Sequence, residues 1–536
     1  MAEGGGSDIT WRRIAWLWGV LALCLYLPAL DYGLFADDEV YLAFKNLIIR
    51  ELPAADLVQL LRAPANPWEF LPVRDFTYWL DLRLFGDDGF GLHLTNWLLY
   101  AVTGTLVFMF VREALTVGAY RRRDAACATV ASFGAALFLL HPAHVEAVVW
   151  IAARKDLLAG IFSLAAVYFL LRAQSVGTCV GYLSASAFLF FLACFSKSAA
   201  VAIVLPTTAL AIRGMVLAES RASRWWMGGV LAAYVSIAIF AMLIHAHFGS
   251  ISNIRIENAP GLGATIERAS RILAYLLKLA FFPNDLGLLH QIYEISDWHW
   301  LVSISAVAGF FWAWFACACG RPIEGPLAVL MILSPTFPYL QFAPFSTWSM
   351  ASERFIFLSV AGLSMLLASG LIRLRRTRGL VISLCLVFSL LGYCTWHRVL
   401  EWDMSSTLMQ REYDRAPAYY LSVLNYVSYR LIPGGEDKIE RVVDGISRDD
   451  AREMAALFFK LRLMDIAERE HASRLGQRSL PPSVELCSGV SQLYALHAQG
   501  IVRLRNDRDV VFSNFLRSID RQMYFLLGDP RQRCNL

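Results

Sequence analysis

The chain has 536 residues, of which 57% are hydrophobic and only 17% charged, and its mean hydropathy is +0.49. This composition is too apolar for a soluble protein of that length and predicts a polytopic membrane protein. The net charge of +4 gives no indication of nucleic-acid binding, because the basic residues cluster at the ends of apolar segments, where they set topology.

The first half of the chain predicts alternating membrane spans. An apolar run at about 16–35 is long enough to be an anchor, and Arg12 and Arg13 before it keep the N-terminus inside. Residues 36–94, rich in aromatic and charged side chains, are then expected outside as interfacial helices. Further spans are expected at about 95–112, 126–140, 157–172, 179–195, 199–213 and 226–247.

The segment 248–352 breaks this simple alternation. Its three apolar pieces, at about 269–283, 299–319 and 325–340, connect two outside positions, so the number of crossings is even. The piece that ends at Pro283 is our candidate for the exception, as a short or half-inserted helix or as one paired with "LGLLHQIY". A last span at about 379–396 leads outside. We therefore predict an all-α polytopic membrane protein, with a bundle of about 11 transmembrane helices (1–400) and a C-terminal helical extramembrane domain (401–536).

The ten cysteines show no disulfide framework and no zinc-ligand spacing. Eight of them lie within or beside apolar segments, where a thiol is usually a small hydrophobic group. Cys487 and Cys534 both lie in the tail, and they could pair if the tail faces an oxidising compartment.

Four polar clusters fall on the predicted external face. They are Asp37, Asp38 and Glu39; the segment "HPAHVEAVVWIAARKD"; Lys197; and Glu353 with Arg354. A charge at membrane depth costs about 2.5–3.5 kcal/mol on insertion scales, so several charges on one side indicate a site. Snorkelling cations and an aromatic belt readily explain any one cluster, but they explain less well the acids and cations of four separate segments.

Metal binding is an alternative for the same residues. His141, His144 and Glu146, or the pair Asp37 and Asp38, could supply ligands. However, "HPAHVE" lacks the His-Glu-x-x-His spacing of a zinc protease, and neighbouring carboxylates alone are a weak signal. A metal is therefore not favoured, although a divalent ion stays open as a cofactor.

Several motifs carry a resemblance to a known family. "FADDEVYLAFKN", "VRDFTYWLDLRLFGDDGFGLHLTNWLLY", "HPAHVEAVVWIAARKD", "FSKSAAV", "FFPNDLGL" and "ASERFIFLSVAG" resemble, in order and spacing, the transmembrane and tetratricopeptide-repeat O-mannosyltransferases and their bacterial relatives. These belong to the GT-C superfamily of polyprenyl-phosphate-sugar glycosyltransferases. The chain departs from their pattern at "VRDF" and "SKSA", where they tend to have Arg-Pro-Leu and Ser-Lys-Glu, so the sugar or acceptor could differ.

The resemblance implies roles for the polar residues. The acidic motif of the first external loop supplies the catalytic carboxylate, which makes Asp38 the expected base, with Asp37 or Glu39 supporting the acceptor. Fixed cations would hold the departing phosphate, and the candidates are Arg154, Lys155, Lys197 and Arg354. Trp68, Trp79 and Trp150 could stack on sugar or simply anchor at the interface. Further substrate-site candidates are Arg74, His93, His141, His144, Glu146, Asp156 and Glu353, of which His93 is also explained as a polar residue where the chain enters a helix.

The expected function is transfer of a sugar from a polyprenyl-phosphate donor to a hydroxyl, such as Ser or Thr of a protein, with inversion. A lipid-sugar transferase or ligase acting on a glycan or glycolipid is the main alternative, and a transporter or a non-catalytic scaffold is the other. The composition, rich in Ala and Arg, suggests a bacterial inner membrane with the tail in the periplasm. The tail resembles a degenerate helical repeat and is a candidate to recruit the acceptor or partner proteins.

Overall fold

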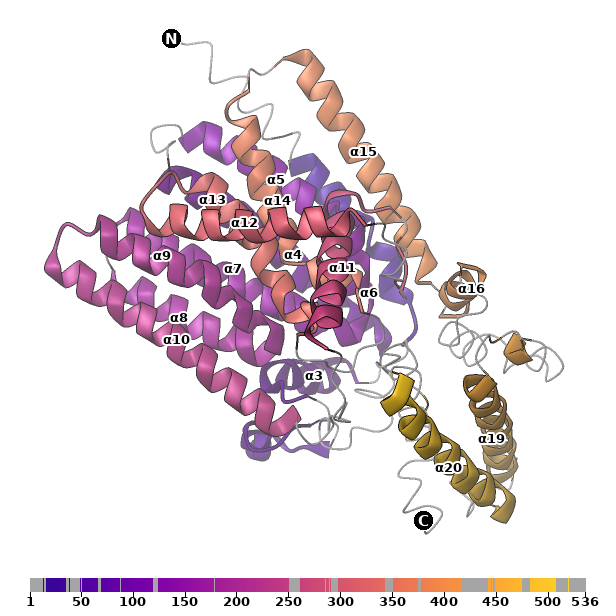
Figure 1. Ribbon diagram of the computed structural model, residues 1–536. Helices are drawn as coiled ribbons and strands as arrows, with labels where there is room; N and C mark the ends of the chain where they lie inside the picture. Colours follow the sequence, from indigo (N-terminus) through magenta and orange to yellow (C-terminus); the bar gives the residue numbers. More distant parts are fainter. Residues whose placement is uncertain are drawn as a thin grey trace.

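The regular elements of the computed structural model are helices throughout the part of the chain that it describes (Figure 1). The described residues are 13, 16–34, 38, 49, 51–65, 69–86, 88–118, 124–177, 179–249, 261–284, 286–288, 290, 297–342, 350–374, 377–403, 405–415, 442–444, 446, 449–474, 483–507 and 519. The all-α class predicted from composition is confirmed for these residues.

Among the described residues, six helices are long and apolar enough to cross a membrane. They include α4 (Gly89–Val117), α10 (Arg221–Gly249), α12 (His299–Ala318) and α15 (Arg378–Glu401), together with the apolar stretches that end in α7 (Arg154–Ser175) and α9 (Val204–Leu217). A bent pair, α5 (Asp124–Leu139) with Pro142–Val149, is a seventh candidate. Shorter apolar helices are Trp16–Asp31, α8 (Val180–Ser196) and α14 (Ser359–Leu371). The chain is thus a multi-pass membrane protein, while the total of about 11 spans stays a prediction.

The segment after α10 contains, where it is described, an amphipathic helix followed by an out-and-back pair, and its number of crossings stays a prediction. The helix α11 (Leu262–Phe281) is amphipathic and does not meet the criterion for a span. Beyond α12, the Arg213 side chain of α9 donates to the Arg321 carbonyl oxygen, 2.6 Å away, just before α13 (Glu324–Leu333). The chain then returns through η8 (Ser334–Leu340), where the Tyr339 ring lies 5.1 Å from the Lys197 amino group. Because Lys197 and Arg213 lie at opposite ends of the η6–α9 stretch (Ser198–Leu217), α12 and α13 with η8 form an out-and-back pair.

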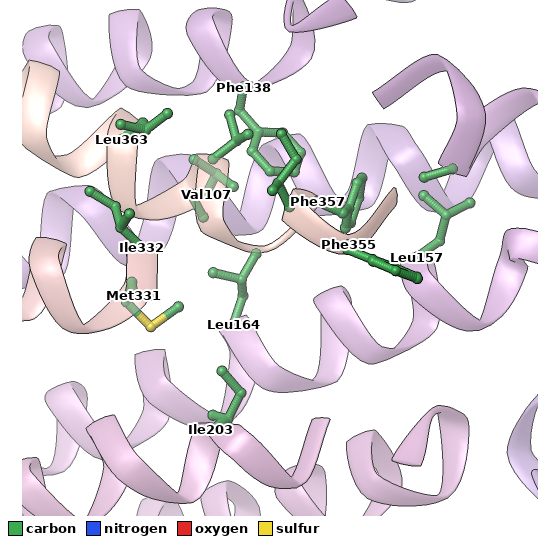
Figure 2. Packing of buried hydrophobic residues seen from close by; sticks show 14 of the residues in the cluster. Val107, Phe138, Leu157, Leu164, Ile203, Met331, Ile332, Phe355, Phe357 and Leu363 are labelled. Carbon is green, nitrogen blue, oxygen red and sulfur yellow. The ribbon is translucent and has the colours of Figure 1, made fainter. Parts of the chain in front are cut away.

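Small and aromatic residues set the packing of the bundle. A Cβ atom on Gly362 of α14 would lie 2.6 Å from the Ile332 nitrogen of α13, so glycine permits this close approach of two helices. Phe138 and Phe357 pack edge to face with ring centroids 5.3 Å apart, and Figure 2 shows them in the buried cluster with Leu157.

The tail is helical where it is described. It begins with α16 (Ser405–Arg415) and continues with a packed pair, α19 (Asp449–Arg474) and α20 (Val484–Asp507). Cys487 of α20 is disulfide-bonded. Cys534, its predicted partner, lies outside the described residues, and the domain division at about 400 stays a prediction.

Candidate functional site

The carboxylate of Asp38 is buried, with 1% of the residue exposed. Its Oδ1 accepts a hydrogen bond of 2.5 Å from the backbone N–H of Ala152. Asp38 is therefore attached to the segment that leads into α7. Its predicted companions Asp37 and Glu39, like Trp68, lie outside the described residues.

The segment 141–156 is a broken, fully packed connection between α5 and α7. Pro142 starts a short 3-10 turn, η4 (Pro142–His144), as its fixed φ favours. The chain axis bends by 56° between Ala125–Leu139 and Pro142–Val149. It continues through α6 (Val145–Val149) and η5 (Ile151–Ala153), and α7 begins at Arg154, where the sequence places the start of the span. This geometry brings one face of the segment to Asp38 and the start of α7 to a cavity.

The cavity has a volume of about 370 Å³ and is walled by α7, η6 (Ser198–Ile203), η8 and η9 (Glu353–Ile356). Its charged lining residues are Asp156, Lys197 and Arg354, and small or apolar side chains form most of the rest. Asp156 Oδ2 and Ser163 Oγ are buried and have no hydrogen-bond partner within the described part of the chain. The cavity is thus lined by two cations, each paired with a carboxylate, and by two unsatisfied polar oxygens.

Lys197 extends from the junction of α8 and η6. Its amino group forms an ion pair with Asp156 and lies over the rings of Tyr339 and Phe355, at 5.1 and 5.6 Å from their centroids. Burial lowers the pKa of Lys197, the Asp156 carboxylate opposes that shift, and the charge of Arg354 lowers the pKa further. A second negative group in this cavity would stabilise the charged form of the lysine.

Arg354 is held by Glu146, which is fully buried. One carboxylate oxygen pairs with the guanidinium, and the other accepts a 2.9 Å hydrogen bond from the backbone N–H of the same arginine. The guanidinium also covers the Trp150 ring at 4.8 Å. Trp150 therefore supports a cation rather than presenting a free face, since it is only 3% exposed.

Lys155 and Arg74 share one carboxylate that sequence reasoning did not single out, that of Glu69. Its two oxygens pair with Lys155 at 2.5 Å and with Arg74 at 2.6 Å. Burial tends to raise the pKa of Glu69, but the two cations outweigh it and hold this pKa well below its usual range. Arg74 also pairs with Asp75 at 2.8 Å. A cluster of two cations and two carboxylates therefore flanks the first turn of α7.

Arg154 is occupied by protein groups on every side. It donates to Asn96 Oδ1 at 2.8 Å and to the Leu92 carbonyl oxygen at 2.9 Å, and it pairs with Asp81 at 2.6 Å. Its guanidinium lies 4.7 Å from the Tyr78 ring centroid. With none of its side chain exposed, Arg154 is placed to fix the start of α7 against α3 (Pro72–Phe85) and α4.

The histidine candidates lie in packing positions. His141 is hydrogen-bonded to the Ala280 carbonyl oxygen at 3.1 Å, and His144 to the Tyr100 hydroxyl at 3.0 Å. His93, 4% exposed, lies in α4. Within the described ranges, no group of three or more His, Cys, Asp and Glu residues is arranged to hold a metal ion. The described residues that were proposed as metal ligands each have another protein partner. For example, Glu146 pairs with Arg354, and Asp38 accepts from the Ala152 N–H.

Glu353, next to Arg354 in the chain, is paired with a cation that the sequence did not suggest. Arg398, near the end of α15, reaches its carboxylate with two contacts of 2.8 and 3.3 Å. His290 Nε2 lies 3.8 Å from the same carboxylate. In the sequence, Arg398 is one more cation at the end of a predicted span, so its pairing with Glu353 was not predicted.

Comparisons with known proteins give limited matches. No protein-family model matches the chain. A protein O-mannosyl-transferase of Caenorhabditis elegans is 36% identical over 97 residues, which are 18% of this chain and 13% of that protein. The chain thus matches about an eighth of that relative's length, and the relative is of the kind that the motifs resemble. The crystal structure of ArnT from Cupriavidus metallidurans bound to undecaprenyl phosphate aligns with 94% of this chain and 76% of that one, at 16% identity and a TM-score of 0.36.

Proposed function

We propose that this protein is a membrane glycosyltransferase that moves a sugar from a polyprenyl-phosphate donor to a hydroxyl acceptor, Ser or Thr of a protein, on the external face. The local match to a protein O-mannosyl-transferase and the motifs that resemble that family support the reaction class. The lipid-linked donor is part of the same proposal, and we assign no role to a metal.

The observation that carries the proposal is the segment Ala152–Asp156. At its start it binds the buried carboxylate of Asp38, and four residues later Asp156 lines the cavity with Lys197 and Arg354. Four residues of α- or 3-10 helix advance only about 6–8 Å. A carboxylate suited to accept a proton and cations suited to hold a phosphate are therefore attached to one short element.

In the proposed reaction the acceptor oxygen attacks the anomeric carbon as the carbon–oxygen bond to the phosphate breaks. Asp38 accepts the hydroxyl proton, a contribution worth about 10² to 10⁴ in rate for a positioned base. The bonding electron pair leaves with the phosphate, whose charge Lys197 and Arg354 stabilise in a cavity of low dielectric. Such a single displacement inverts the anomeric centre.

The remaining cations divide between two roles. Lys155 and Arg74 are bridged by the partly exposed Glu69 and do not line the cavity, so we assign them to the approach of the donor rather than to the phosphate itself. Arg154 is fully coordinated by Asn96 and Asp81, so we assign it to holding α7 in place rather than to contact with the donor.

We place the site and the tail outside the membrane, in the periplasm of a bacterium. The basic inside loops of the sequence support this orientation, and so does the disulfide bond of Cys487, because disulfides persist in oxidising compartments. A tail on the same side as Asp38 could recruit the acceptor.

Mass spectrometry of external proteins and surface glycans, from cells with and without the protein, tests this function. A hexose on Ser or Thr that disappears with the protein supports protein O-glycosylation. Loss confined to a glycan or glycolipid would overturn the protein acceptor in favour of a lipid-sugar ligase, and unchanged spectra would overturn glycosyl transfer.

A further inference from the structure

The C-terminal segment is attached to the cavity through a closed ring of polar contacts. The ring begins at Glu353, whose neighbour Arg354 lines the cavity. Arg398 binds Glu353 and also donates to Glu401 at 2.7 Å, at the end of α15. Glu401 in turn pairs with Arg411 of α16. Every link joins oppositely charged groups, so the position of α16 is coupled to that of Glu353.

The second half of the ring runs through the segment 286–288. The backbone N–H of Leu288 donates to Glu412 Oε1 at 2.9 Å, and Arg415 donates to the Leu286 carbonyl oxygen at 3.3 Å. Glu412 is only 2% exposed, so this is a buried, charge-assisted contact. His290, two residues on, lies against Glu353 and closes the ring.

Gly287 lies at the point of contact between α16 and this segment. A Cβ atom there would collide with the Arg415 guanidinium and would come within 2.8 Å of Glu412 Oε1. A side chain at this position would displace the ends of the Arg415 and Glu412 side chains, so Gly287 leaves room for the two contacts that dock α16.

We propose that α16 positions Arg354, the cation assigned to the donor phosphate. The docking of α16 on residues 286–288, through Glu412 and opposite Gly287, holds Arg398 on Glu353. Because Glu353 precedes Arg354 in the chain, this contact sets the position of Arg354 in the cavity. Glu412 and Gly287 are positioning residues, because neither lines the cavity. The inference rests on the proposed function for its kinetic consequence, although not for its structural one. Because α16 leads into the tail, an acceptor bound by the tail could change the donor site by the same route.

Two variants of the full-length protein test this relay, by which we mean the coupling of α16 to Arg354 through Arg398 and Glu353. Glu412→Ala removes the acceptor of the Leu288 N–H, and Gly287→Ala crowds the Arg415 and Glu412 side chains where α16 docks. For both we expect the Kd for undecaprenyl phosphate, used as the probe, and the KM for the lipid donor to rise roughly tenfold or more, since small misplacement of a binding group is costly. Glu412→Gln keeps an oxygen acceptor and should restore most of the loss. Gly263→Ala, where a Cβ meets nothing within 4 Å, is the matched control.

A purely structural role predicts a different pattern, in which less protein is active and kcat falls with Kd and KM unchanged. That pattern, or parental values in both variants, would overturn the relay. Hydrogen exchange of residues 353–358 supplies a readout without donor: it should quicken in Glu412→Ala and not in Gly263→Ala. If the parent neither binds the lipid nor transfers sugar, the proposed function fails. The hydrogen-exchange rates of residues 353–358 then decide the relay, and equal rates in the parent and Glu412→Ala would refute it.

Discussion

Asp38 and Ala152 lie 114 positions apart in the chain, and the carboxylate of the first accepts the backbone N–H of the second at 2.5 Å. This contact attaches Asp38 to η5, just before α7. It places an acid that the sequence marks as catalytic beside the segment that lines the cationic cavity.

Replacing Asp38 with Asn separates its chemistry from its structural contact. The amide oxygen of Asn can still accept from Ala152, so the fold should be kept, but the amide cannot accept a proton. We expect sugar transfer to fall by about 10² to 10⁴, measured with purified protein and lipid donor. The thermal unfolding midpoint serves as the control. Transfer at the parental rate would remove Asp38 from the mechanism.

The pair formed by Arg354 and Glu146 allows stability and activity to be distinguished. Arg354→Met leaves a buried glutamate without its partner and should cost about 3–5 kcal/mol of stability. Adding Glu146→Gln removes that uncompensated charge, so thermal unfolding in detergent should return towards the parental midpoint. Transfer should stay lost in the double variant. Regained transfer would show that Arg354 serves the fold alone.

Lys197 should act on the donor more than on the acceptor. In Lys197→Met the cavity loses one of its two cations, so we expect the Kd for undecaprenyl phosphate to rise at least tenfold, with a similar rise in donor KM. The acceptor KM should change little. Lys460→Met, at an exposed position of the tail, is the control. Equal Kd values for the two variants would contradict the assignment.

His290 predicts a pH dependence of stability. Burial, helped by the cations Arg415 and Arg398, lowers its pKa from 6.5 to about 3. Between these two pH values, His290 is therefore protonated in the unfolded chain and neutral in the folded chain. The stability from this group is complete above about pH 6.5 and is lost as the pH falls towards 3, by up to about 1.4 kcal/mol per pH unit.

The variant His290→Asn should therefore lose less stability than the parent between pH 6.5 and 4.5, as followed by thermal unfolding. His397→Asn, at an exposed position of α15, should keep the parental slope. Parallel curves for the parent and His290→Asn would refute the shift.

The sequence predicts the spans well because apolar length is a local property. The 3-10 turn at Pro142 and the start of α7 at Arg154, just before the predicted span 157–172, follow from local rules. The piece that ends at Pro283 forms the amphipathic α11, and its half-insertion stays a prediction.

Pairing between distant segments could not be read in the same way. Nothing near Glu69 or Asp81 indicates that they neutralise Lys155 and Arg154, and Arg398 has no local sign of its bond to Glu353. Whether a cation is free for a ligand depends on which acid reaches it in three dimensions. For this reason Arg154, grouped in the sequence with Lys155, has a different environment in the structure.

Asp38 is proposed to accept the proton of the acceptor hydroxyl during sugar transfer on the external face. The most direct measurement compares the intact masses of external proteins and the surface glycolipids from cells with the parent protein, with Asp38→Asn at equal abundance in the membrane, and with no copy of the protein. We expect a hexose on Ser or Thr only in cells with the parent protein. Identical protein and glycolipid masses in all three cells would contradict it.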